Sequence, residues 1–380
     1  MQTKKWIDAD GGGYDHDEMT TVAMEALCLF EQQQTLDADG EQLFNDLETL
    51  DNLKKIAMEQ VSESHLDYTG MLYAVNDIKA RWFLSESVGL ESASCPRTAF
   101  IKEVDIAMEG LMSNIGNWFS EKLSGMWKSF KKMFNISEQS RKWLEKNEAD
   151  YLEYAAGHPF ELKRKMEYSY LYIASKFDIA RHLDLGKNGR DITNAADAFY
   201  AVINPAKGYM LDTYNWDEAT AKLERIAISG VADQAIQQAM PLIIKKDSRA
   251  QVKALPGNIY IATAITPTGT RKTGWAAPLV EKTSDTITLT PSDTNKLMPA
   301  LRSLVEVTSD ISYKFNKEQA SVKKAQDKLA KFEAEGRGNV KQLKQDIKNA
   351  VSVESAISAS LVRTLIAVNM LARQSLKQAT

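Results

Sequence analysis

The chain of 380 residues has little cysteine and little histidine, and both shortages exclude classes of site. Its two cysteines, Cys28 and Cys95, lie far apart and form no CxxC motif. This spacing excludes a disulfide framework and a cysteine-bound zinc site. The four histidines are equally scattered and no HExxH pattern occurs, so we predict no metal and no cofactor.

Long apolar runs are also missing. No run reaches the roughly 18 apolar residues that a membrane-spanning helix needs, and the N-terminal residues lack the apolar segment of a secretory signal. We therefore expect a reduced, intracellular setting. The net charge of −4 argues against a protein that binds duplex DNA over its whole surface, which would normally be basic. The length favours two or three domains.

Most catalytic signatures are absent. The sequence contains no GxSxG, no glycine loop ending in Gly-Lys-Ser/Thr and no GxGxxG after a strand. Four isolated residues in the middle of the chain are the candidates for an enzyme site, and such residues more often have buried or capping roles. They are His158, His182, Asp191 and Asp197. We therefore predict a protein that is not an enzyme.

Two acidic segments, 8–19 and 37–48, imitate part of a calcium-binding loop. The first ends in Met19 where the loop needs a carboxylate, and the second has Gln42 where the sharp turn needs glycine. An Asp at a helix N-cap with Glu in the first turn explains 37–48 without a metal.

Apolar residues at spacings of three and four predict a mainly α fold. The pattern breaks at Asp39-Gly40 and in the small, polar stretch that ends at Pro96, and Ser137 and Ser140 offer a new helix start. The helices expected from this pattern cover 17–34, 43–56, 64–85, 96–115, 117–134, 137–154 and 162–182.

The pattern changes near residue 250, where apolar and polar residues alternate at period two. This alternation predicts short antiparallel strands over 252–255, 259–263 and 286–290, with residues 269–274 forming a hairpin loop. Two long helices, 294–335 and 340–378, follow around a Gly-Arg-Gly turn. We therefore expect a helical N-terminal region (1–91), a helical body (92–249), a small β insert (250–291) and a long C-terminal helical hairpin (292–380).

Residues 117–134 form the sharpest local feature, because lysines are interspersed with an aromatic face. A basic helix of this kind suits a membrane surface or the groove of a partner. A core helix whose lysines face water is the alternative. The residues of the face are Phe119, Leu123, Met126, Trp127, Phe130, Met133 and Phe134.

The tip of the predicted hairpin, 314–348, carries ten basic residues against five acidic ones. This local excess could contact phosphates, although a solvated helix face has the same composition. The candidate phosphate contacts are Lys323, Lys324, Lys328, Lys331, Arg337 and Lys341.

Several short strings occur together in one layout. They are Met24-Glu25-Ala26-Leu27, Leu50-Asp51-Asn52-Leu53, Gly89-Leu90-Glu91-Ser92 and the closing segment 369–378, NMLARQSLKQ. With an acidic helical N-terminal region, this layout resembles the internal head (inner-body, prohead core) proteins of giant tailed phages of the phiKZ type. The resemblance covers the two ends, about a third of the chain, and does not extend to 136–291.

The resemblance implies a precursor that a prohead protease cuts after a small-x-Glu site. Carried over to this sequence, the recognised residues are Gly89, Leu90 and Glu91, with cleavage before Ser92. The loop expected before Pro96 would give a protease access. The same pattern recurs at Glu59, Glu109 and Glu354, but there it lies in predicted helices.

We therefore expect a non-enzymatic phage structural protein, packaged inside the head and delivered with DNA. Its expected partners are other virion head proteins, the prohead protease, its own copies, packaged DNA and a membrane surface. Its expected location is the virion interior, and the host cytoplasm during assembly or after ejection. The alternative is an adaptor or scaffold protein that oligomerises through its C-terminal hairpin as a coiled coil.

Overall fold

The fold is mainly α, with 76% of the described residues in helices. The structure is a computed structural model, and it describes residues 18–59, 68–84, 95–163, 170–185, 188–203, 216–231, 234–241, 243–244, 250–266, 269–278, 286–317, 324, 327 and 340–380.

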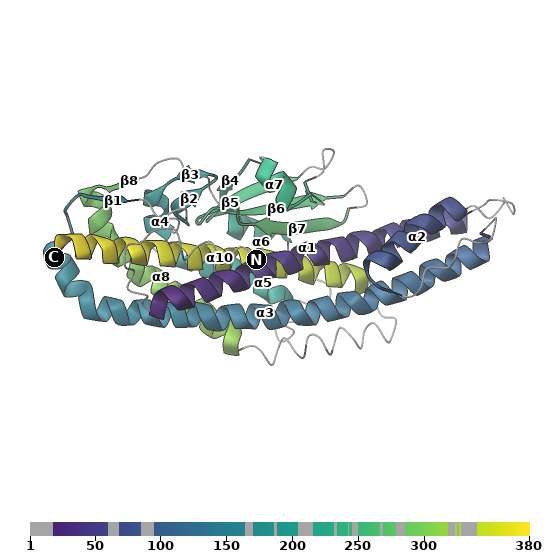
Figure 1. Ribbon diagram of the computed structural model, residues 1–380, viewed down its shortest axis with the longest axis horizontal. Helices are drawn as coiled ribbons and strands as arrows, with labels where there is room; N and C mark the ends of the chain where they lie inside the picture. Colours follow the sequence, from purple (N-terminus) through teal and green to yellow (C-terminus); the bar gives the residue numbers. More distant parts are fainter. Residues whose placement is uncertain are drawn as a thin grey trace.

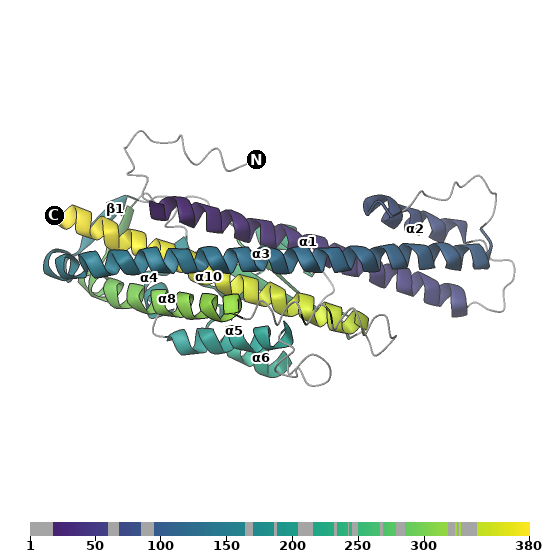
Figure 2. The ribbon, with the colours of Figure 1, turned by 90° about the horizontal axis from the view of Figure 1, so that it is seen from below.

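Two long helices, α1 (Glu18–Glu59) and α3 (Arg97–Tyr154), run antiparallel and give the molecule its length (Figures 1 and 2). The short helix α2 (Thr69–Arg81) packs against both at one end. The heptad-like apolar positions predicted for α1, such as Leu43, Leu47 and Leu50, are buried as expected.

The expected break at Asp39-Gly40 is wrong, because α1 continues through it. Gly40 is instead a point of close contact between α1 and α3, since a Cβ at this position would overlap the indole of Trp118. The glycine is therefore needed for close packing between helices. In the same way, a Cβ at Gly125 of α3 would overlap the side chain of Gln33.

The expected division of 96–154 into three helices is also wrong, because α3 is continuous. Ser137 and Ser140 do not cap a helix but lie buried inside it. The Ser137 hydroxyl donates to the carbonyl of Phe134 (2.8 Å), and Ser140 accepts a hydrogen bond from Asn369 (2.9 Å). A serine that bonds within its own turn does not need to end the helix.

The helix expected over 162–182 is replaced by three short strands and a short helix. The strands are β1 (Phe160–Lys163), β2 (Tyr172–Ile173) and β3 (Lys176–Phe177), and the helix is α4 (Ile179–Leu185). Ala174 and Ser175 have positive φ angles of 49° and 60°, so they form the tight turn between β2 and β3. Asn258 accepts the Ser175 N–H (3.0 Å). Contacts distant in sequence therefore override the helical periodicity here.

The main sheet has four antiparallel strands in the order β4-β5-β6-β7. They are β4 (Ile228–Ser229), β5 (Gln251–Leu255), β6 (Ile259–Ile265) and β7 (Arg271–Ala276). Strands β5 and β6 confirm the prediction, but the hairpin loop expected at 269–274 is largely the edge strand β7. The third expected strand, β8 (Thr286–Leu289), pairs with β1 outside this sheet.

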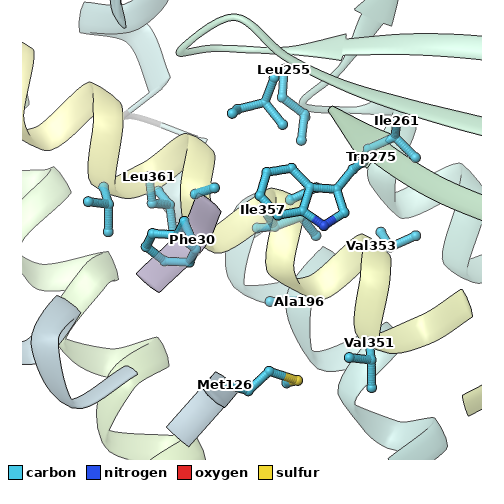
Figure 3. Packing of buried hydrophobic residues seen from close by; sticks show 14 of the residues in the cluster. Phe30, Met126, Ala196, Leu255, Ile261, Trp275, Val351, Val353, Ile357 and Leu361 are labelled. Atoms are coloured by element: carbon cyan, nitrogen blue, oxygen red, sulfur yellow. The ribbon is translucent and has the colours of Figure 1, made fainter. Parts of the chain in front are cut away.

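The sheet lies between two helical layers. One face, with Leu255, Ile261 and Trp275, packs on the C-terminal helix α10 (Val340–Ala379), as Figure 3 shows. The other face, with Tyr260 and Ala262, packs against the short helix α7 (Gln234–Ala239). Alternate residues of the strands therefore serve two separate clusters, as period two requires.

Helix α8 (Pro291–Lys317) and α10 pack antiparallel, as expected for a hairpin (Figures 1 and 2). Helices α5 (Gly189–Ile203) and α6 (Trp216–Glu224) lie beside them.

Helix α10 is central, and every residue from 347 to 369 is buried. In the described residues, its segment Gln342–Ala379 is the one helix apolar enough to cross a membrane, and its apolar window is wholly buried inside the protein. A core helix has the same properties.

Candidate functional site

The residues predicted for proteolysis and phosphate binding lie mostly outside the described structure. This is true of the cleavage site 89–92 and of Lys323, Lys328, Lys331 and Arg337. Lys324 is exposed. Lys341 lies in the first turn of α10, and its side chain is outside the described part. Both predictions therefore stay predictions.

The aromatic face of 117–134 lies inside the protein. Five of its seven residues are buried, while Trp127 and Phe134 are partly covered. The ring of Phe130 stacks on Phe315 of α8, with centroids 4.1 Å apart. The face proposed for a membrane or partner is thus packed against the protein's own helices, as in the core-helix alternative, except that Lys122 is fully buried and does not face water.

The four residues considered for an enzyme site have structural surroundings. His158 is exposed, Asp191 pairs with Arg225 (3.1 Å) and Asp197 pairs with Lys314 (2.9 Å).

His182 is fully buried, and its Nε2 accepts the Gly257 N–H (2.9 Å). Its Nδ1 lies 2.5 Å from the carbonyl oxygen of Asp178. Burial lowers the pKa of His182 to about 4, so the ring is neutral at physiological pH. A neutral ring with both nitrogens occupied fixes α4 to the turn between β5 and β6.

A buried network of charged side chains joins α1, α3, β7 and α10. Its first centre is Asp37 of α1, which is 4% exposed. Asp37 pairs with the fully buried Lys122 of α3 (2.9 Å) and accepts hydrogen bonds from the Trp275 indole (2.5 Å) and the Ser352 hydroxyl (3.1 Å). Burial lowers the pKa of Lys122, and the charge of Asp37 opposes that shift.

The second centre of this network is Glu41, one helical turn further along α1. Glu41 forms an ion pair with Lys348 of α10, which is fully buried. Lys272 of β7 lies between Glu41 (3.8 Å) and Glu48 (3.1 Å). The spacing of Asp37, Glu41 and Glu48 thus places three carboxylates toward cations from β7, α3 and α10.

The same network covers the edge of the sheet. Lys348 donates to the carbonyl of Thr273 (2.6 Å), and Asn349 accepts the Thr273 N–H (3.0 Å). Asn349 also donates to the carbonyl of Arg271 (2.8 Å). An uncovered edge strand would offer these groups to another chain, so α10 replaces the missing neighbouring strand.

One carboxyl group in α10 is buried without an ion pair in the described residues. Glu354 is fully buried and accepts a hydrogen bond from Ser358 (2.9 Å). Burial raises its pKa to about 8, so it carries a proton at neutral pH.

A pocket of about 650 Å³ opens beside the network. Its walls come from α1 (Glu31 to Gln42), from the residues that end and follow α7 (Ala239 to Ile243) and from β7 (Gly274 and Trp275). One wall is therefore acidic and the other apolar. This pocket and the network are the candidate functional site.

Sequence reasoning missed this site because Asp37 and Glu41 resembled a helix start. Two signals could have found it. Lys348 and Ser352 are polar residues on an otherwise apolar helix, where partners are needed inside the protein. The charge is also divided: residues 1–91 hold 19 acidic and 6 basic side chains (net −13), whereas 92–380 hold 41 basic and 32 acidic ones (net +9).

The described residues contain no group of three or more His, Cys, Asp and Glu side chains that could hold a metal ion. Comparison with protein-family models, curated proteins and solved structures found no match for this chain.

Proposed function

We propose that the protein is a non-enzymatic structural protein of a tailed-phage head, made as a precursor and cut between Glu91 and Ser92. The single observation that carries the proposal is the charge division between a strongly acidic N-terminal region and a basic remainder. The resemblance to internal head proteins of the phiKZ type gives this division a role. Before cleavage, the acidic region would keep the basic remainder from binding polyanions.

The contacts of α1 support this role. Its carboxylates pair with basic groups of the remainder: Asp37 with Lys122, Glu48 with Lys272, and Glu41 with Lys348. Helix α1 therefore lies as an acidic strip over cations from α3, β7 and α10.

The same helix is too well packed to leave passively after a cut. Five of its large apolar residues are buried, and at about 2 kcal/mol each they contribute roughly 10 kcal/mol. They are Phe30, Leu43, Phe44, Leu47 and Leu50. We therefore propose that processing first gives a nicked protein in which residues 1–91 stay bound to the remainder.

A role without catalysis fits how the charged groups of the candidate site are used. Lys122 is paired with Asp37 and Lys348 with Glu41 in the interior, so these two cations are engaged by carboxylates of α1. The adaptor alternative needs a free apolar seam on the C-terminal hairpin. In the described part of that hairpin, α10 buries its apolar residues inside the protein, so an adaptor would need another surface.

The decisive experiment measures intact mass and N-terminal sequence for the protein from its native particle or host cell. We expect a chain that starts at Ser92, accompanied by the fragment 1–91 when the sample is kept native. The substitution Glu91→Gln should leave the full-length chain.

The matched controls are Glu59→Gln and Glu109→Gln, which alter the same motif within α1 and α3. Both should leave processing unchanged, since a protease needs an extended strand. If the native protein starts only at Met1, the precursor proposal fails and the adaptor becomes the better candidate.

A further inference from the structure

Helix α1 lies on a surface that the rest of the chain builds. It packs against α3, α10 and β7, which all belong to residues 92–380 (Figures 1 and 2). Because α1 is the first described element, a single chain connection, after Glu59, joins it to these elements. The helix and the surface beneath it therefore have the relation of a ligand and its site.

This surface directs five side-chain donors at α1. We call them the α1-binding face: Trp118, Lys122, Trp275, Lys348 and Ser352. Trp118 donates to the carbonyl of Leu36, and Lys122 donates to the carbonyl of Gln33 (2.8 Å). The remaining bonds of the face end on the carboxylates of Asp37 and Glu41.

The charge of the α1-binding face selects an acidic helix. Lys122 and Lys348 are fully buried, and a buried cation that loses its counter-ion is strongly destabilising. Asp37 and Glu41 are four residues apart on one side of α1, so they pair with both cations at once. A nucleic acid would set phosphates against the apolar residues beside these lysines, and an apolar helix would leave both lysines without a counter-ion.

The shape of the face is equally selective. Trp118 lies so close to α1 that only glycine fits opposite it, at Gly40. Leu43 and Leu47 continue the same contact and are buried. A ligand must therefore place a glycine between two carboxylates that are one helical turn apart. A carboxylate three residues before a glycine and another directly after it occur together once in this sequence, in α1.

We infer that the α1-binding face is a self-recognition site, and that copies of this chain associate by exchanging α1. In the exchanged pair, α1 of one copy lies on α3, β7 and α10 of the second copy. The contacts are those of the single chain, so exchange requires no new surface and is favoured when copies are concentrated. Both chains are intact, so the inference does not rest on cleavage after Glu91.

Cross-linking of two co-expressed full-length chains tests this inference. Lys54 of α1 and Asp105 of α3 lie 2.6 Å apart, and both side chains are partly exposed. One chain carries Lys54→Cys and the other Asp105→Cys, and a short bismaleimide joins thiols that are close together. Both chains also carry Cys28→Ser, because this native thiol is partly exposed. In the control, the second chain carries Glu153→Cys, at the exposed far end of α3.

Mass mapping of the cross-linked peptides gives the result. We expect the link between positions 54 and 105 of different chains to exceed the control link between 54 and 153 at least tenfold. The two variants change exposed positions, so both chains should fold. Equal yields of the two links would overturn the inference, because α1 would then lie only on its own chain.

A second measurement uses the buried pair itself. A chain with Asp37→Asn and a chain with Lys122→Met each leave one buried charge unpaired when α1 stays on its own chain. In the exchanged pair, the intact Asp37 meets the intact Lys122, and the two uncharged positions meet each other. The co-expressed mixture should therefore melt at a higher temperature than either variant alone. A melt equal to the sum of the two separate melts would contradict exchange.

Discussion

Removing the charge of Asp37 should destabilise the protein strongly, because Lys122 would stay buried without a counter-ion. Lys122 is fully buried and would keep one bond, to the carbonyl of Gln33 (2.8 Å). Removing one partner of a buried ion pair costs about 3–5 kcal/mol of stability. Asp37→Asn should therefore lower the free energy of unfolding by this amount. Lys122→Met should cost less, about 1–3 kcal/mol, because Asp37 keeps its donors Trp275 and Ser352.

The double variant separates the pair from its surroundings. The double variant Asp37→Asn with Lys122→Met has neither charge, so its free energy of unfolding should lie within about 1 kcal/mol of that of the more stable single variant. The two substitutions would then be coupled by several kcal/mol. Urea unfolding followed by circular dichroism measures these free energies, and the m-value should stay constant.

A control pair joins the same two helices at the surface. Lys54 and Asp105 lie 2.6 Å apart with side chains 31% and 44% exposed, so Asp105→Asn should cost less than about 1 kcal/mol. If Asp37→Asn cost no more than Asp105→Asn, or if the two buried substitutions were additive, the buried pair would not clamp α1 to α3.

Four further substitutions have defined outcomes. The pKa of Glu354 is raised from 4.5 to about 8, so the free energy of unfolding should fall as pH rises from 4.5 to 8. Thermal melts of Glu354→Gln should show a smaller fall over this pH range. An unchanged slope in the variant would contradict the assignment to Glu354. The pKa of His182 is lowered from 6.5 to about 4, so the free energy of unfolding should fall as pH drops from 6.5 to 4. His182→Gln should remove this acid-dependent loss of stability. If the loss persists in the variant, other groups cause it. Gly40→Ala should lower the free energy of unfolding, measured in urea, by about 1–3 kcal/mol, because the new Cβ overlaps Trp118. Gly116→Ala has open space around its Cβ and should stabilise α3 by about 0.5–1 kcal/mol. Equal effects of the two substitutions would show that α1 and α3 are not in close contact at Gly40.

Helical periodicity predicted the architecture because most of the chain packs through one apolar stripe per helix. Leu43, Leu47 and Leu50 follow that rule, and so does the hairpin of α8 and α10. The breaks in the pattern were misleading. Gly40 and Ser137 suggest helix ends when only the sequence is considered. In the structure, Gly40 makes room for Trp118, and the Ser137 hydroxyl bonds to the carbonyl of Phe134, so both residues fit inside continuous helices.

The remaining errors come from contacts that sequence spacing does not contain. Strand β1 forms because β8, more than a hundred residues later, pairs with it. The buried network could not be predicted because Asp37 meets Lys122 and Ser352 only after three helices have packed. Single-sequence patterns describe one element at a time, whereas these interactions belong to several.

The central place of α10 has a consequence for synthesis on the ribosome. Among the described elements it is the last in chain order, yet α1, α3, α5, α8 and the sheet all pack on it. Until it emerges, the edge of β7 is uncovered and Glu41 lacks Lys348. The nascent chain can therefore pack α1 on α3 and α3 on α8 before α10 emerges, but the part of the core that surrounds α10 forms only in a late step.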